Sequence, residues 1–91
     1  MRVLFFAATL TLAVTSNAES QELKGGPGDA ARGEQAYQTT CLRCHGPSQR
    51  IRSRIPGDTA AEKARWLDAF LGRHYAEDDK LRADLIAFLA Q

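Results

Sequence analysis

The sequence Cys41-Leu42-Arg43-Cys44-His45 places two thiols and an imidazole within five residues. In this C-x-x-C-H spacing the two cysteines can bond to the vinyl groups of a haem, and the histidine can bind the iron from the same side. The other use of such a pair, a disulfide between Cys41 and Cys44, would close a loop too small to stabilise a fold much. The motif therefore predicts one covalently attached haem c per chain.

A leader-like segment precedes the motif. Met1-Arg2 is followed by an apolar run from Val3 to Val14, which ends in Thr15-Ser16-Asn17-Ala18. A positive start, a short apolar run and a small-residue cleavage site are typical of a signal peptide. The run is short for a membrane span. We therefore expect removal of residues 1–18, and a mature protein that is soluble and periplasmic or otherwise exported.

The mature chain is small and nearly neutral. Removal of 18 residues from 91 leaves 73, with 11 Lys and Arg (12 less Arg2) against 11 Asp and Glu. This balance gives no indication of a nucleic-acid binder. A single domain of this size has a marginal core without an added staple. A buried porphyrin would supply the missing apolar centre.

Three helices are expected after a flexible lead-in over residues 19–28. Asp29 is a candidate N-cap for a helix over 30–40, which runs into the motif. Thr59 and Glu62 form a capping box for a helix over 60–71, with Gly72 as a stop. The acidic stretch 77–79 begins a final helix over 78–90. The intervening segment, 46–57, has the Gly and Pro content of an irregular loop.

Apolar residues recur at helical spacing in the second and third of these helices. In the second they are Trp66, Leu67, Phe70 and Leu71, and in the third Leu81, Leu85, Phe88 and Leu89. Lys80, Arg82 and Asp84 are then expected to face solvent. No strand pattern appears. The sequence predicts an all-α domain over residues 29–91, with three main helices around one covalently bound haem.

From Asp29 to Ala90 the chain resembles a small class I cytochrome c. The resemblance is carried by Gly33 and Tyr37, by C-L-R-C-H-G at 41–46, and by A-D-L-I-A-F-L at 83–89. It implies that the first and last helices cross, with the glycine permitting close approach. Gly33 would then contact Phe88.

The second axial ligand is where the chain departs from that family. The family's usual ligand is a methionine before the last helix, and the only methionine here, Met1, lies in the leader. A His/Met pair is therefore excluded if the haem stays within one chain. His74 occupies the corresponding loop and is the only histidine besides His45. We favour ligation by both histidines, with a lower potential than a His/Met cytochrome.

Alternatives remain for this position. His74 could be a solvated loop residue, which would leave an open or weakly ligated iron. Less favoured substitutes are Lys24, Lys63, Lys80 and Tyr75, since a lysine must first lose its proton. The asparagine used by some similar cytochromes is not available, because Asn17 lies in the leader.

Several other residues are candidates for contact with the haem or a partner. We expect Trp66 either to hydrogen-bond a haem propionate, as the resemblance implies, or to belong to the core. Tyr37 is expected to pack helices or the haem, and Arg54 to bind a propionate. Four arginines could form a docking patch for an acidic redox partner or a solvated loop: Arg43, Arg50, Arg52 and Arg54.

The function expected from these features is one-electron transfer, without enzymatic activity of its own. The chain leaves no room for a substrate-binding domain, although it could be the haem subunit or acceptor of a larger oxidoreductase. An open-site haem protein that binds small ligands is the alternative. A zinc site built from Cys41, Cys44, His45 and His74 is disfavoured, because adjacent Cys44 and His45 would not easily face one tetrahedral ion.

Overall fold

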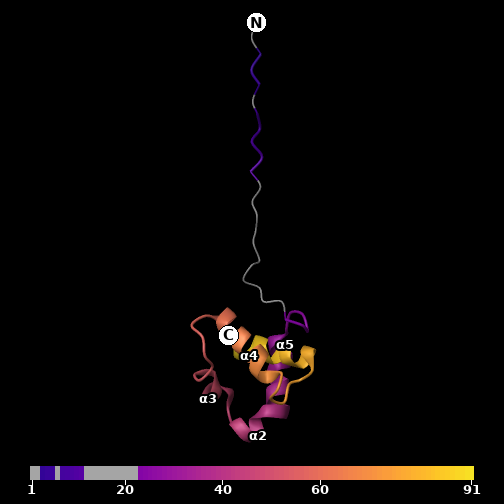
Figure 1. Cartoon of the computed structure of the whole chain (residues 1–91), viewed down its shortest axis with the longest axis vertical. Coiled ribbons are helices and arrows are strands. Elements are labelled where there is room, and N and C mark those ends of the chain that lie inside the picture. Colours follow the sequence, from indigo (N-terminus) through magenta and orange to yellow (C-terminus); the bar gives the residue numbers. More distant parts are fainter. Residues whose placement is uncertain (1–2, 6, 12–22) are drawn as a thin grey trace.

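Helices account for the regular secondary structure of the residues that the structure describes. The computed structural model describes residues 3–5, 7–11 and 23–91, and this part contains no strand. The helical segments are α1 (Ala30–Ala36), the π-helical turn η1 (Tyr37–Cys41), α2 (Leu42–His45), α3 (Ser48–Arg52), α4 (Ala60–Leu71) and α5 (Asp79–Leu89) (Figure 1). The all-α expectation is confirmed for the described residues.

The proposed leader falls largely outside the described residues. Its described parts, 3–5 and 7–11, contain neither helix nor strand. Within the described ranges, no helix is both long and apolar enough to cross a membrane.

Each of the three long helical stretches begins at a side-chain cap, as the sequence indicated. The Asp29 carboxylate accepts a hydrogen bond from the N–H of Arg32, and that of Asp78 accepts one from the N–H of Leu81, both at 2.8 Å. Thr59 and Glu62 form the reciprocal capping box at the start of α4. These bonds satisfy backbone N–H groups that have no partner within the helix.

The first helix does not end at Thr40. The backbone continues through η1 and α2 as far as His45, where Gly46, with φ of 69°, terminates it. The π-helical turn adds backbone over Tyr37–Cys41, and the Thr39 hydroxyl donates to the carbonyl oxygen of Gln35 at 3.0 Å. Such turns accommodate an added residue without breaking the helix. The expected irregular loop over 46–57 also contains one short helix, α3.

The close crossing of α1 and α5 organises the domain (Figure 1). Gly33 is buried at this crossing, and a Cβ there would overlap the Asp84 carbonyl and lie 2.8 Å from Cβ of Phe88. One turn later Tyr37 packs against Phe88, with ring centroids 5.9 Å apart. The expected contact of Gly33 with Phe88 is therefore confirmed.

The lead-in is packed on α5 from Leu23 onward. Leu23 contacts the hydrophobic core, Gly25 lies against the backbone of Asp79, and Gly28 lies against that of Ala83. Lys80 donates to the carbonyl oxygen of Pro27 at 3.2 Å. The described part of the segment expected to be a flexible lead-in therefore belongs to the helical domain.

Arg82 is buried, and the expectation that it faces solvent is wrong. Its guanidinium bonds to the carboxylates of Asp68 (2.8 Å) and Asp79 (2.6 Å). It also donates to the carbonyl oxygens of Ala76 and Glu77 at 3.0 Å. One side chain thus joins α4, the loop after it and the start of α5. Its charge is compensated, which permits burial.

Asp84 is buried as well, again contrary to expectation. Its carboxylate accepts bonds from the Asp29 N–H (2.8 Å) and the Arg32 side chain (3.1 Å), and Lys80 lies 3.7 Å away. Burial alone would raise the pKa of Asp84. The hydrogen bonds from Arg32 and Asp29, with the charges of Arg32 and Lys80, outweigh burial and lower this pKa below its ordinary value.

Gly33→Ala is expected to destabilise the domain by about 1–3 kcal/mol, because the added methyl forces α1 and α5 apart. Urea unfolding measures the change. Gln35→Ala, at an exposed position on the same helix, is the control and should stay within about 0.5 kcal/mol of wild type. Equal stability of the two variants would show that the helices tolerate a wider crossing.

Stability should fall on acidification as the pH passes below the ordinary aspartate pKa of about 3.9. Because the pKa of Asp84 is lowered in the folded state, its stabilising contribution is complete above that value. The contribution is lost as the pH falls through the lowered pKa. Thermal unfolding from pH 6 to 2 should show a shallower pH dependence for Asp84→Asn than for wild type. Parallel curves would contradict this role.

Candidate functional site

The two histidines of the chain lie next to each other. His45 ends α2, and His74 follows α4 in the turn before α5. Their ring centroids are 6.0 Å apart, with 63° between the ring planes. The fold therefore brings together the two imidazoles that the sequence singled out, although they are distant along the chain.

Backbone hydrogen bonds fix the turn that carries His74. The Leu71 carbonyl oxygen accepts from the N–H groups of His74 (3.1 Å) and Ala76 (3.2 Å). Tyr75, between them, has φ of 63°. The helix end at Gly72 was expected, but Gly72 itself keeps helical angles. The left-handed residue of this turn is Tyr75, which no sequence rule identified.

Aromatic rings form a row that includes His74. Trp66 stacks on Phe70 with centroids 4.8 Å apart and planes 15° apart, and Phe70 lies 4.6 Å from His74. Tyr75 packs edge-on against His74, with ring centroids 5.0 Å apart. We name Trp66, Phe70, His74 and Tyr75 the aromatic row.

Trp66 is not a core residue, contrary to one of the two expectations for it. Its side chain is 39% exposed, whereas Leu67 and Leu71 are buried. Adjacent residues on a helix point about 100° apart, so the leucines reach the core, Phe70 packs against it while partly exposed, and Trp66 is the more exposed ring. α4 thus supplies buried leucines to the core and two further aromatic side chains to the aromatic row.

The two cysteines lie on the same continuous helix as His45 and are free thiols. Cys41 is partly buried against the core, and Cys44 is exposed. Burial, and to a lesser degree the charge of Cys44, raise the pKa of Cys41. Within the described part of the chain, no group of three or more His, Cys, Asp or Glu is arranged to hold a metal ion. The four proposed zinc ligands therefore do not converge as a set.

Tyr37 anchors the motif to the helix crossing. It is 2% exposed, and its hydroxyl donates to the carbonyl oxygen of Gly46 at 2.6 Å. Burial raises the pKa of Tyr37. The expectation of a helix-packing role is confirmed, whereas the bond to Gly46, directly after the motif, was not anticipated.

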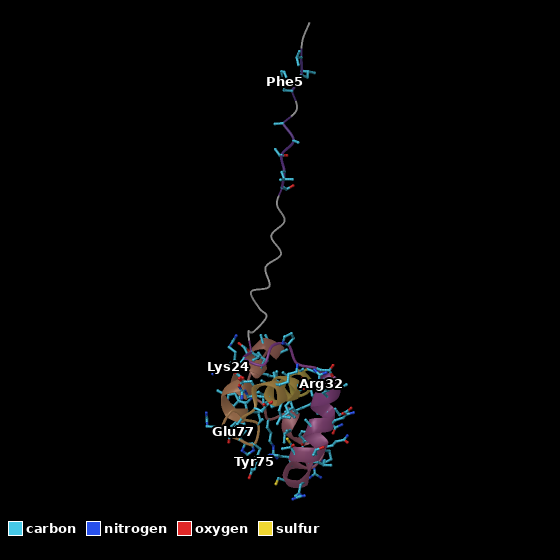
Figure 2. All side chains as sticks on the ribbon, turned by 90° about the vertical axis from the view of Figure 1, so that its right-hand side faces the viewer. Phe5, Lys24, Arg32, Tyr75 and Glu77 are labelled. Carbon is cyan, nitrogen blue, oxygen red and sulfur yellow. The ribbon has the colours of Figure 1, made fainter. Side chains whose placement is uncertain are left out.

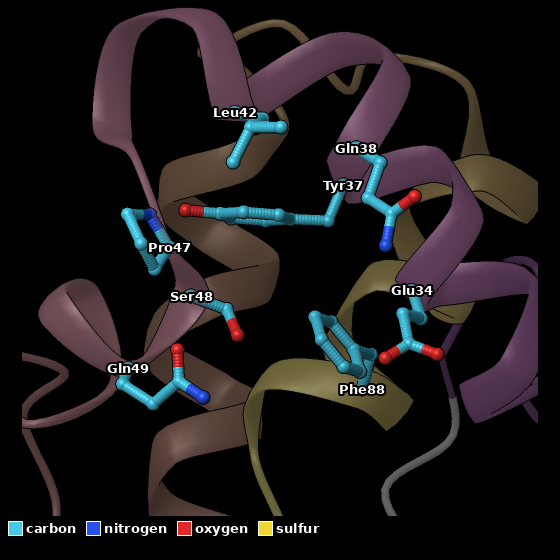
Figure 3. A pocket seen from close by; sticks show the side chains of 8 residues that line it. All are labelled: Glu34, Tyr37, Gln38, Leu42, Pro47, Ser48, Gln49 and Phe88. Carbon is cyan, nitrogen blue, oxygen red and sulfur yellow. The ribbon is translucent and has the colours of Figure 1, made fainter.

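A half-open pocket of about 240 Å³ lies beside the Tyr37 ring rather than between the histidines. Figure 3 shows the residues that line it, which are Glu34, Tyr37, Gln38, Leu42, Pro47, Ser48, Gln49 and Phe88. Neither His45 nor His74 belongs to this lining. The pocket is therefore distinct from the paired imidazoles.

The four arginines near the motif do not act as one group. Arg43, Arg50 and Arg54 are exposed, while Arg52 is partly buried. The Arg52 guanidinium lies 4.4 Å from the centre of the Phe88 ring and donates to the Phe88 carbonyl oxygen at 2.7 Å. Arg52 thus stabilises the end of α5, through a cation–π contact and a charged hydrogen bond.

Comparisons with protein-family models, curated proteins and solved structures find no match for this chain.

Tyr37→Phe is expected to destabilise the domain by about 1 kcal/mol, because the Gly46 carbonyl loses its short hydrogen bond while the ring packing is kept. Thermal unfolding measures the loss. Tyr75→Phe, which removes a hydroxyl from a largely exposed side chain, is the control and should be neutral. Two neutral variants would mean that water replaces the tyrosine hydroxyl without cost.

Proposed function

We propose that the chain is an exported or periplasmic one-electron carrier that holds a single haem c. Cys41 and Cys44 attach the haem covalently, His45 is the proximal iron ligand, and His74 is the distal ligand. The domain is then a small cytochrome c-like domain with bis-histidine ligation.

The spacing of His45 and His74 is the observation that carries this proposal. A metal–imidazole bond is about 2 Å long. Two imidazoles on opposite sides of one metal therefore have ring centroids roughly 6 Å apart, since each centroid lies about 1 Å beyond its bonded nitrogen. The observed separation of 6.0 Å fits this arrangement.

The surroundings of the imidazoles also fit a porphyrin. Trp66 and Phe70 are only partly covered by the protein and continue the row from His74. A porphyrin would cover apolar surface of this kind, and its burial would add to a small core. The thiols of Cys41 and Cys44, on the helix that ends at His45, are free to form thioether bonds.

In this proposal the side chains of the protein bind the haem and fix its orientation. When bound, haem supplies one-electron chemistry at its iron. Two neutral imidazole ligands stabilise the reduced form less than a His/Met pair does, so a lower potential is expected. If His45 and His74 both bind the iron, no position on it would be left for a substrate. This arrangement favours electron transfer over catalysis.

Docking to an acidic redox partner is supported by the exposed guanidinium groups of Arg43, Arg50 and Arg54. Arg43 lies within the motif itself, and the other two lie in the segment after it. Charge of one sign near the redox group accelerates encounter with an oppositely charged partner. Arg52 is not part of this proposed surface, because Phe88 engages it.

The first test is production of the chain in cells that attach haem c, followed by optical and low-temperature EPR spectra. We expect haem that stays with the protein under denaturing conditions, and a low-spin ferric signal. His74→Ala should convert the signal to high spin. Arg73→Ala, an exposed residue of the same turn, should leave it unchanged.

Each alternative gives a different result. A high-spin spectrum that His74→Ala does not change would indicate an open iron and a ligand-binding haem protein. Colourless protein that retains zinc would indicate a metal site without haem. Haem lost on denaturation from the Cys41→Ser, Cys44→Ser double variant, and retained in wild type, would support thioether attachment.

A further inference from the structure

Tyr75 adopts a backbone conformation that its side chain disfavours. It is the only non-glycine residue with positive φ, at 63°, among the described residues. This left-handed region is readily adopted by glycine and costs free energy for a bulky residue. The side chain is 75% exposed and lies at the edge of the molecule (Figure 2). Burial of the ring therefore does not account for a tyrosine at this position.

The end of α4 does not explain the choice of residue either. Gly72 lies directly after the helix, yet it has φ of −61° and ψ of −19°. The left-handed bend comes three residues later, at Tyr75, and brings the N–H of Ala76 back to the Leu71 carbonyl. A glycine at 75 would close the same turn with less strain. The turn alone therefore does not explain why residue 75 is a tyrosine.

The side chain of Tyr75 contacts the His74 ring. Its ring meets His74 at 5.0 Å and 84°, an edge-on contact, while Phe70 lies 4.6 Å from His74 at 31°. Besides His45, the imidazole thus has two aromatic neighbours, one from α4 and one from the turn. Contacts of this geometry restrict rotation of the central ring.

We propose that Tyr75 is a positioning residue for His74: its ring holds the imidazole in the orientation that faces His45. This inference rests on the proposed function, in which His74 is the distal iron ligand. Tyr75 would slow the dissociation of His74, and would thereby keep external ligands from the iron. The contact between Tyr75 and His74 would be the reason that a tyrosine, rather than a glycine, occupies this left-handed position.

Cyanide binding to the ferric, haem-loaded chain tests the proposal. At saturating cyanide the observed rate becomes limited by His74 dissociation. Tyr75→Gly keeps the turn and removes the ring, so this limiting rate should rise about three- to tenfold. Tyr75→Phe keeps the ring and should match wild type. The melting temperature of Tyr75→Gly should stay within a few degrees of wild type, because relief of the left-handed strain offsets the greater unfolded-chain entropy of glycine.

The outcomes separate this role from a general effect on folding. An unchanged limiting rate in Tyr75→Gly would overturn the proposal. So would a melting temperature several degrees below wild type, since the ring would then support the fold rather than His74 specifically. His74→Ala should bind cyanide without a rate limit. If wild type also shows no limit, His74 is not the ligand, and both this role and the proposed ligation fail.

Discussion

The backbones of α1 and α5 approach so closely at Gly33 that no side chain fits between them, and the rest of the domain depends on this crossing. It aligns Tyr37 with Phe88, and Tyr37 in turn bonds to the carbonyl of Gly46. Because one continuous helical stretch runs from α1 to His45, the crossing also sets the position of the cysteine motif. A substitution at Gly33 would therefore shift both the start of α1 and the cysteine motif that ends at His45.

Two buried charged residues of α5 also connect this helix to its neighbours. Asp84 bonds to the backbone at the start of α1, and Arg82 connects α5 with α4 and the intervening loop. Each charged group has several partners, which offsets the cost of removing it from water. The same helix thus positions α1, which leads to His45, and α4, which leads to His74. His45 and His74 therefore follow two helical stretches that both pack on α5.

Unlike the helix crossing and the buried charges, the aromatic row does not connect the helices of the core. Trp66 is 39% exposed and Tyr75 75% exposed, and neither belongs to the core, yet the row packs around His74. A strained backbone at Tyr75 and uncovered rings beside a histidine are features of a site rather than of a folding core. A bound porphyrin would give both features a physical reason, and the proposed function supplies it.

Local sequence determined the helices and the candidate ligands. Caps at Asp29, Thr59 and Asp78, and the C-x-x-C-H spacing, act over a few residues and could be identified without coordinates. The burial of Arg82 and Asp84 could not, because their partners come from distant segments and a charged residue on a helix ordinarily faces water. The extension to His45, the separation of Trp66 from the core and the left-handed Tyr75 were likewise decided by tertiary packing. The sequence thus determined which groups are candidate haem ligands, and only the fold decided that His45 and His74 lie 6.0 Å apart, because that spacing depends on how α5 joins two separate helices.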